Sequence, residues 1–245
     1  AEPLKFRTQE VIELKQLIIQ YINCVKFYGE HTINLEKKCN KIPDVNAFKS
    51  TTNFMDCWII ETINSIGFNT NKHMNDFDIA KTVRNLIDFI ETLTNYYIKF
   101  NRDRMKGKYG TEEWTTSLGV LYYVLKNYNI LLAPFAPFLS DYIWSHISKI
   151  SNISDSIHQL NIPDYDKTNK YIPTFNLMIR IAKLIRSARC KTKTHTSLKT
   201  PIYSCDIFMN DTTELDKLAT SIDSVQTELN CMNFSYGKFS SQVEY

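Results

Sequence analysis

Cationic side chains are the residues of this sequence whose type and spacing best suit a chemical role. Five basic residues and one acid lie between Lys99 and Lys108, and nine basic residues with no acid lie between Lys167 and Cys205. The net charge is +3, so the remaining residues sum to −10. Concentrated cations attract polyanions, nucleic acids above all. The candidate RNA-contacting residues are Lys99, Arg102, Arg104, Lys106, Lys108, Arg180, Lys183, Arg186, Arg189, Lys191 and Lys193.

Aromatic rings accompany the first cluster and leave two interpretations open. Tyr96, Tyr97 and Trp114 lie near these cations, and such mixtures fit RNA loops, whose unstacked bases lie on aromatic or guanidinium planes. Alternatively, the rings are core and the cations complement a helix C-terminus, which is the interpretation we favour for Tyr97. We expect Arg102 to contact RNA, because its planar fork can hold a phosphate or a base edge. We expect a structural role for Asn101, with hydrogen bonds to the turn at Gly107 or to a neighbouring helix, because Asn is unfavourable within a helix.

The second cluster lies on a predicted helix with one apolar face. Lys183 and Arg186 point nearly opposite that face. A basic ridge suits a phosphate backbone, and the alternative is an ordinary solvated face. The acid-free stretch of 39 residues favours RNA. The predicted apolar face comprises Leu177, Ile181, Leu184, Ile185 and Ala188.

Patterns typical of catalytic or metal sites are missing from the sequence. It has no phosphate-binding glycine loop, no G-x-S-x-G motif and no zinc motif, and its five histidines are scattered. The six cysteines form no C-x-x-C pair, which predicts reduced thiols and a cytoplasmic location. We therefore predict no catalytic residue, no metal and no cofactor in this chain. The most apolar region, Val120–Trp144, contains Lys126 and two prolines, which predicts a buried helix pair rather than a membrane span.

A low content of turn-forming residues predicts long helices. The chain has only six Gly and seven Pro among 245 residues. Irregular connections are expected at 29–51, 68–75 and 150–170, with Asn75 or Asp76 capping the third helix. Apolar residues at helical spacing predict helices over 7–28, 54–67, about 75–107, 111–132, a fifth that ends near Lys149, and a sixth from Pro173 to Lys191.

The pattern changes near the end of the chain. Residues 201–209 alternate and predict a strand, residues 211–229 resemble a helix, and residues 231–236 suggest a second strand. The predicted fold class is mainly α: a helical bundle over residues 1–190, followed by a small α/β unit over residues 191–245.

Five segments resemble class I aminoacyl-tRNA synthetases of the isoleucine group, in the order in which that family carries them. Asn101-Arg102, Met105-Lys106-Gly107 and Ser156-Ile-His158 favour the eukaryotic or archaeal type of isoleucyl-tRNA synthetase. Tyr96 stands where the family usually has Trp, and Lys99 and Asp103 stand where it usually has Arg, so no phosphate contact is expected from Asp103. The resembling segments are residues 1–6, 53–59, 95–107, 132–139 and 156–163.

The resemblance implies an anticodon-binding bundle whose cations contact the stem and loop of isoleucine tRNA, with phosphate contacts setting register and base contacts giving identity. The family's two ATP-site motifs, of the H-x-G-H and K-M-S-K-S types, have no match here. The resemblance therefore implies that ATP serves a catalytic domain of the full-length ligase. Catalytic and editing domains would be partners within one polypeptide, and this region alone would not activate isoleucine.

Two alternatives remain open from the sequence. One is the equivalent region of a valyl- or leucyl-tRNA synthetase, which charging assays on the full-length enzyme would distinguish. The other is a non-catalytic helical module that binds protein and no RNA, for which tRNA binding would show no steep salt dependence.

Overall fold

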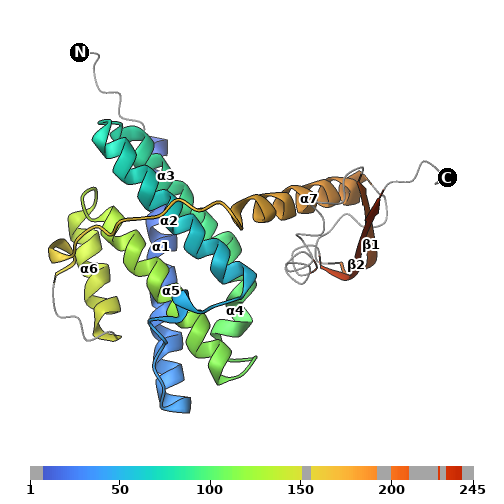
Figure 1. Cartoon of the computed structure of the whole chain (residues 1–245), viewed down its shortest axis with the longest axis horizontal. Coiled ribbons are helices and arrows are strands. Elements are labelled where there is room, and N and C mark those ends of the chain that lie inside the picture. Colours follow the sequence, from blue (N-terminus) through green and yellow to red (C-terminus); the bar gives the residue numbers. More distant parts are fainter. Residues whose placement is uncertain (1–7, 151–155, 192–199, 210–225, 227–229, 239–245) are drawn as a thin grey trace. The chain divides into compact units, whose positions relative to one another are not determined.

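The structure, a computed structural model, describes residues 8–150, 156–191, 200–209, 226 and 230–238. The chain divides into two compact units, Ala1–Thr168 and Asn169–Tyr245. The first is a helical bundle, and the second contains a helix and two paired strands (Figure 1). The predicted mainly α fold class is confirmed. The division lies before the last helix rather than after residue 190, so this helix groups with the strands.

The first helix, α1 (Thr8–Cys39), continues beyond its predicted end. Gly29 lies within it, and a Cβ atom at Gly29 would meet nothing within 4 Å, so this glycine neither ends the helix nor permits a close contact. The predicted connection therefore begins only after Cys39, and it contains a short 3-10 turn, Ala47–Lys49. Buried residues at helical spacing carry the core face past residue 28 and include Tyr21, Cys24, Tyr28, Thr32 and Leu35.

Helix α2 (Phe54–Asn75) also runs past its predicted end at Gly67. The Asn53 side chain caps its start by accepting hydrogen bonds from the backbone N–H groups of Met55 and Asp56, at 3.0 and 3.3 Å. A Cβ atom at Gly67 would collide with the ring of Tyr165. This glycine therefore makes room for a neighbouring side chain, and residues 68–75 are helical rather than a loop.

Helix α3 (Ile79–Thr92), a π-helical segment (Leu93–Ile98) and α4 (Lys99–Met105) follow one another directly. The cap of α3 is Asp78, whose side chain accepts a hydrogen bond from the N–H of Lys81 at 3.1 Å. The predicted caps are wrong, because Asn75 and Asp76 end the preceding helix. A π-helical turn takes up extra backbone and rotates the residues that follow it. This segment therefore determines which face α4 presents to the bundle.

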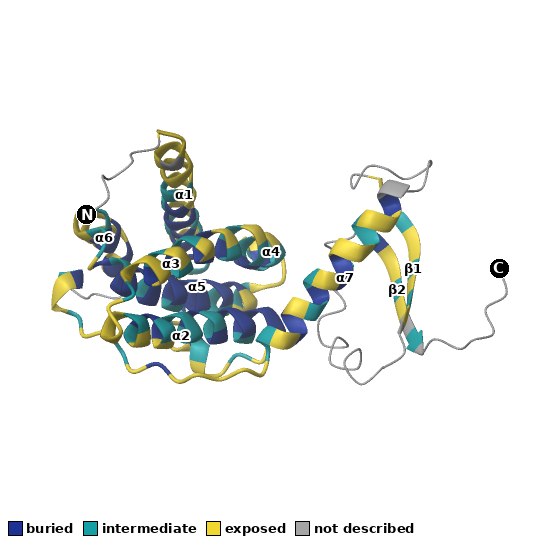
Figure 2. Ribbon diagram, turned by 90° about the horizontal axis from the view of Figure 1, so that it is seen from above, coloured by how far each residue is buried: buried dark blue, intermediate teal, exposed yellow. Residues whose placement is uncertain are grey.

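Helix α5 (Thr111–Leu132) is the central helix of the bundle and packs against α1, α2, α3, α4 and α6 (Pro137–Ile147). It is buried along most of its length (Figure 2). Its Gly119 permits a close approach, since a Cβ atom there would collide with the backbone oxygen of Asp44 in the connection before α2. The predicted helix pair within residues 120–144 is confirmed. Short 3-10 turns follow at Ser148–Ile150 and Ile157–Gln159.

The second unit contains α7 (Ile172–Lys191), β1 (Ile202–Met209) and β2 (Cys231–Lys238). The two strands are parallel, with Ile202 opposite Cys231. Both predicted strands and the predicted sixth helix, from Pro173 to Lys191, are confirmed. The predicted helix over residues 211–229 lies outside the described residues, apart from residue 226.

Hydropathy identifies no membrane-spanning helix among the residues described by the structure.

Candidate nucleic-acid interface

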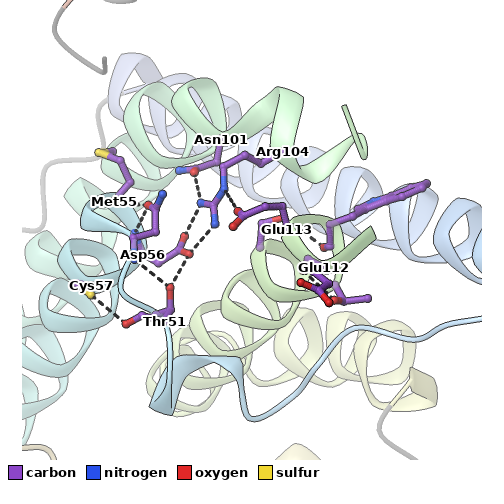
Figure 3. Close-up of polar contacts among 12 residues, drawn as sticks. Thr51, Met55, Asp56, Cys57, Asn101, Arg104, Glu112 and Glu113 are labelled. Carbon is purple, nitrogen blue, oxygen red and sulfur yellow. Dashed lines mark hydrogen bonds and ion pairs between the residues drawn. The ribbon is translucent and has the colours of Figure 1, made fainter. Parts of the chain in front are cut away.

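A buried ion pair fixes α4 to the rest of the bundle (Figure 3). Arg104 on α4 donates from Nη1 to Asp56 Oδ1 at 3.1 Å and from Nη2 to Asp56 Oδ2 at 3.0 Å. The Asp56 side chain, in the first turn of α2, is fully buried. Arg104 Nε donates to Glu113 at the start of α5 at 2.8 Å. One guanidinium thus joins three helices through a geometry that matches its planar fork.

Two further groups complete the hydrogen bonding around Asp56. The Tyr97 hydroxyl donates to Oδ1 at 2.8 Å, and the Thr51 hydroxyl donates to Oδ2 at 3.0 Å. Burial, and next the Asp56 charge, raise the pKa of Tyr97 well above its ordinary value, so this hydroxyl keeps its proton and remains a donor. The carboxylate is therefore compensated by a cation and by two hydroxyls, as a buried charge requires.

Asn101 has the structural role expected for it, with different partners. Its side-chain NH2 donates to the carbonyl oxygen of Tyr97 at 3.0 Å, and its side-chain oxygen accepts from Arg104 Nη1 at 2.5 Å. Tyr97 lies in the π-helical segment, so Asn101 connects that segment to the buried ion pair. The expected partners, the turn at Gly107 or a neighbouring helix, do not receive its hydrogen bonds.

This geometry gives Arg104 a structural role within the bundle and does not support its predicted contact with RNA. Its side chain is only 11% exposed, and both ends of its guanidinium face carboxylates of the same chain. Burial alone would lower the pKa of Arg104, but hydrogen bonds and charge attraction from Asp56 outweigh it and raise the pKa. The sequence could not distinguish Arg104 from Arg102, because Asp56 lies 48 residues away along the chain.

The turn after α4 explains why two of the predicted aromatic residues are core. Gly107 has φ +79°, and a Cβ atom there would collide with the indole of Trp114. Trp114 and Tyr97 are both buried, so the core interpretation holds for these two rings. Tyr96 is half-buried, with its ring centroid 6.4 Å from that of Phe100.

Four of the predicted cations remain exposed on and after α4: Lys99, Arg102, Lys106 and Lys108. Lys108 pairs with Asp103 at 2.8 Å in a largely exposed salt bridge. The unusual acid at position 103 thus neutralises one cation of the cluster. An exposed pair of this kind contributes at most about 1 kcal/mol and is easily exchanged for a phosphate. We call Lys99, Arg102 and Lys106 the α4 cations.

Two aromatic residues of α1 lie beside Arg102 and Lys106, and sequence analysis missed both. The rings of Phe27 and His31 meet edge to face, with centroids 4.3 Å apart. The guanidinium carbon of Arg102 lies 6.0 Å from the Phe27 ring centroid. Their spacing of four residues on one helix was the available signal, but nothing in the sequence indicated which element α4 would face.

Helix α7 presents the second cluster differently from the prediction. Arg180 and Lys183 are exposed, Arg186 is half-buried, and Arg189 is buried. Arg189 donates from Nη2 to the carbonyl oxygen of Thr200 at 2.6 Å, so its predicted contact with RNA is not supported. The side chain of Lys191 and all of Lys193 lie outside the described residues.

The buried face of α7 is rotated from the predicted one. Leu184, predicted to be on the apolar face, is 63% exposed, and Ala188 is exposed as well. Among the predicted residues, only Ile181 is buried, with Leu177 and Ile185 half-buried. The buried apolar residues start two residues before Leu177 and include Phe175, Met178, Ile181 and Ala182.

Comparison with known proteins gives a family and a consistent set of relatives. Residues 56–204 match the family described as the anticodon-binding domain of tRNA ligase. The chain is 32% identical over 244 residues to an isoleucine–tRNA ligase of Tetrahymena thermophila, covering 94% of this chain and 22% of that protein.

Two further relatives agree with this result. Cytoplasmic isoleucine–tRNA ligases of Caenorhabditis elegans and Saccharomyces cerevisiae are 28% and 29% identical, over 94% of this chain and over 20% and 22% of their own lengths. The chain thus spans about a fifth of the length of the curated relatives it matches.

Proposed function

Since the chain belongs to the family of anticodon-binding domains of tRNA ligases, we propose that it binds the anticodon stem and loop of isoleucine tRNA. The chain is homologous to eukaryotic isoleucine–tRNA ligases over nearly all of its length. It is therefore a region of an aminoacyl-tRNA synthetase, and recognition of isoleucine tRNA is the role that we assign to it.

The observation that supports RNA binding most directly is that the basic residues at the end of α4 differ in exposure and in pairing. Arg104 is used within the bundle, whereas Arg102 and Lys106 are exposed. Among the described residues, the structure pairs neither Arg102 nor Lys106 with a carboxylate. Unpaired exposed cations on a firmly held helix end are suited to phosphates, because binding releases counterions without disrupting the fold.

Recognition in this proposal is positional and involves no bond making. The α4 cations contact the phosphate backbone and set the orientation of the RNA, while base contacts in the loop give identity. The exposed residues Arg180 and Lys183 of α7 provide a second set of phosphate contacts. The ion pair between Asp56 and Arg104 acts indirectly, by holding α4 against α2.

The proposal extends to the whole enzyme as follows. A catalytic domain elsewhere in the same polypeptide would use ATP to join isoleucine to the tRNA held here, and an editing domain would be a further partner. ATP is thus assigned to the full-length ligase and not to this region. Action in the cytoplasm is supported by the names of the relatives.

A titration with tRNA at several salt concentrations tests this function. We expect the logarithm of the association constant to fall linearly with the logarithm of salt concentration, by roughly 0.7–0.9 per phosphate contacted. Arg102→Ala should flatten this slope, and Arg84→Ala, at an exposed position on α3, should leave it unchanged. Absence of tRNA binding, or binding without a salt slope, would favour a protein-interaction module instead.

A further inference from the structure

Two pairs of residues, one on α1 and one at the end of α4, come together outside the core. Phe27 and His31 are four residues apart on α1, and Arg102 and Lys106 are four residues apart at the end of α4, so each pair lies on one helix face. The rings of Phe27 and His31 are in contact, and Arg102 lies over the Phe27 ring. Arg102 and Lys106 are exposed, and both rings are half-buried.

We propose that Phe27, His31, Arg102 and Lys106 form a phosphate-binding site for tRNA in which His31 takes up a proton when the phosphate binds. The proposal rests on the tRNA-binding function above and adds a specific site and a proton to it. Arg102 and Lys106 supply two permanent positive charges, and His31 supplies a third that appears only on binding. The Phe27 ring contacts the imidazole of His31 and the guanidinium of Arg102 and thereby orients both groups.

The charges around His31 explain why the free imidazole is neutral. Burial lowers the pKa of His31 below its ordinary value, and the positive charges of Lys106 and Arg102 lower it further. Glu30, its neighbour on α1, acts in the opposite direction. Uncharged imidazole is thus the form present near neutral pH in the free protein.

An arriving phosphate changes this balance. Its negative charge offsets Lys106 and Arg102, the two groups that oppose protonation of His31. The pKa of His31 is therefore higher in the complex than in the free protein. Because the bound state holds more protons, affinity must increase as the pH falls through the interval between the two pKa values.

The primary experiment measures tRNA affinity at fixed ionic strength between about pH 7.5 and pH 6, where an ordinary histidine titrates. We expect the chain to bind more tightly as the pH falls, by at most about tenfold per pH unit for one proton. His31→Gln should remove most of this pH dependence. The matched control is His146→Gln on α6, an exposed histidine outside the site, which should keep the dependence.

A second measurement observes the proton directly. The titration of the His31 ring, followed by NMR in the full chain, should shift to higher pH when inorganic phosphate is added. Arg102→Ala should raise the pKa of His31 in the free protein and reduce the further shift caused by phosphate. The shift caused by phosphate is not expected if Arg102 and Lys106 serve only to complement the end of α4.

The outcomes separate this site from the general function. If the chain binds tRNA but His31→Gln keeps the parent pH dependence, the proton-linked site is wrong and the tRNA-binding function stands. An unchanged His31 titration in phosphate would also overturn the site. If the chain binds no tRNA at any pH, the proposed function itself fails.

Discussion

At the scale of single residues, Arg102 and Arg104 show how two neighbouring arginines of one helix acquire opposite roles. Arg104 lies between Asp56 and Glu113 and is largely buried. Arg102 lies at the surface over Phe27. Their difference comes entirely from the direction in which each side chain leaves α4. We therefore expect the buried guanidinium of Arg104 to stabilise the fold and the exposed guanidinium of Arg102 to bind RNA.

We predict that Arg104→Ala destabilises the bundle by about 3–5 kcal/mol, because it leaves the Asp56 carboxylate buried without its cation. Chemical unfolding would measure this loss. Arg84→Ala, at an exposed position on α3, is the matched control and should change stability by less than about 0.5 kcal/mol. A stable Arg104→Ala variant with weakened tRNA binding would restore Arg104 to the RNA-contacting residues.

Arg102→Ala should instead weaken tRNA binding and leave the unfolding midpoint close to that of the parent. The expected cost is about 1–3 kcal/mol if Arg102 contacts a base edge, and less if it meets only a phosphate. Comparison of isoleucine tRNA with other tRNAs distinguishes the two cases, because only a base contact changes selectivity. If every tRNA binds the variant as it binds the parent, the RNA surface does not include this end of α4.

At the scale of elements, the glycines show what the sequence could and could not indicate about helix ends. Gly29 and Gly67 both suggested a helix end, and both lie inside helices. The sequence shows that a residue lacks a side chain, but not whether a neighbour occupies that space. Tyr165, which fills the space at Gly67, is 98 residues further along the chain.

Substitution of the two glycines by Ala is therefore expected to change stability in opposite directions. Gly29→Ala should stabilise the protein by about 0.5–1 kcal/mol, because Ala suits a helix interior and a Cβ there meets nothing. Gly67→Ala should destabilise it by about 1–3 kcal/mol, because the new methyl group displaces the ring of Tyr165. Thermal unfolding of the two variants checks both signs. Equal effects at the two positions would show that Tyr165 does not pack as described.

Helix existence was predictable where apolar spacing was regular, as in α5 and α7. Exact ends were not predictable where two helices compete for neighbouring polar residues. Asn75 and Asp76 looked like caps of α3, yet they end α2, and Asp78 caps α3 instead. The sequence also showed no sign of the π-helical segment Leu93–Ile98, although this segment sets the directions in which the side chains of Asn101 and Arg104 leave α4.

At the scale of the whole molecule, the chain consists of a helical bundle and a second, smaller unit, each with its own basic surface. The family match, residues 56–204, includes α7 together with the bundle. The concentration of charge was evident from the sequence, and so was the resemblance from which RNA binding was predicted. The sequence did not show which cations reach the surface, because it does not reveal the partners that cover Arg104 and Arg189.

The second surface gives a prediction for α7. Substituting both Arg180 and Lys183 by Ala should weaken tRNA binding and flatten its salt dependence with little change in stability, because both side chains are exposed. Arg189→Ala should lower stability instead, since Arg189 is buried and holds the carbonyl of Thr200. Paired binding and unfolding curves would show the contrast. A stability loss in the double variant without loss of tRNA affinity would assign these cations to intramolecular contacts.

The central claim, recognition of isoleucine tRNA by this region, is tested most directly by one competition experiment. The affinity of the chain is measured for purified isoleucine tRNA and for valine, leucine and methionine tRNAs, at one pH and one salt concentration. Our account predicts tightest binding to isoleucine tRNA, with a preference that is lost when its anticodon is exchanged for that of valine tRNA. Equal affinity for all four tRNAs, or a preference unaffected by the anticodon exchange, would contradict it.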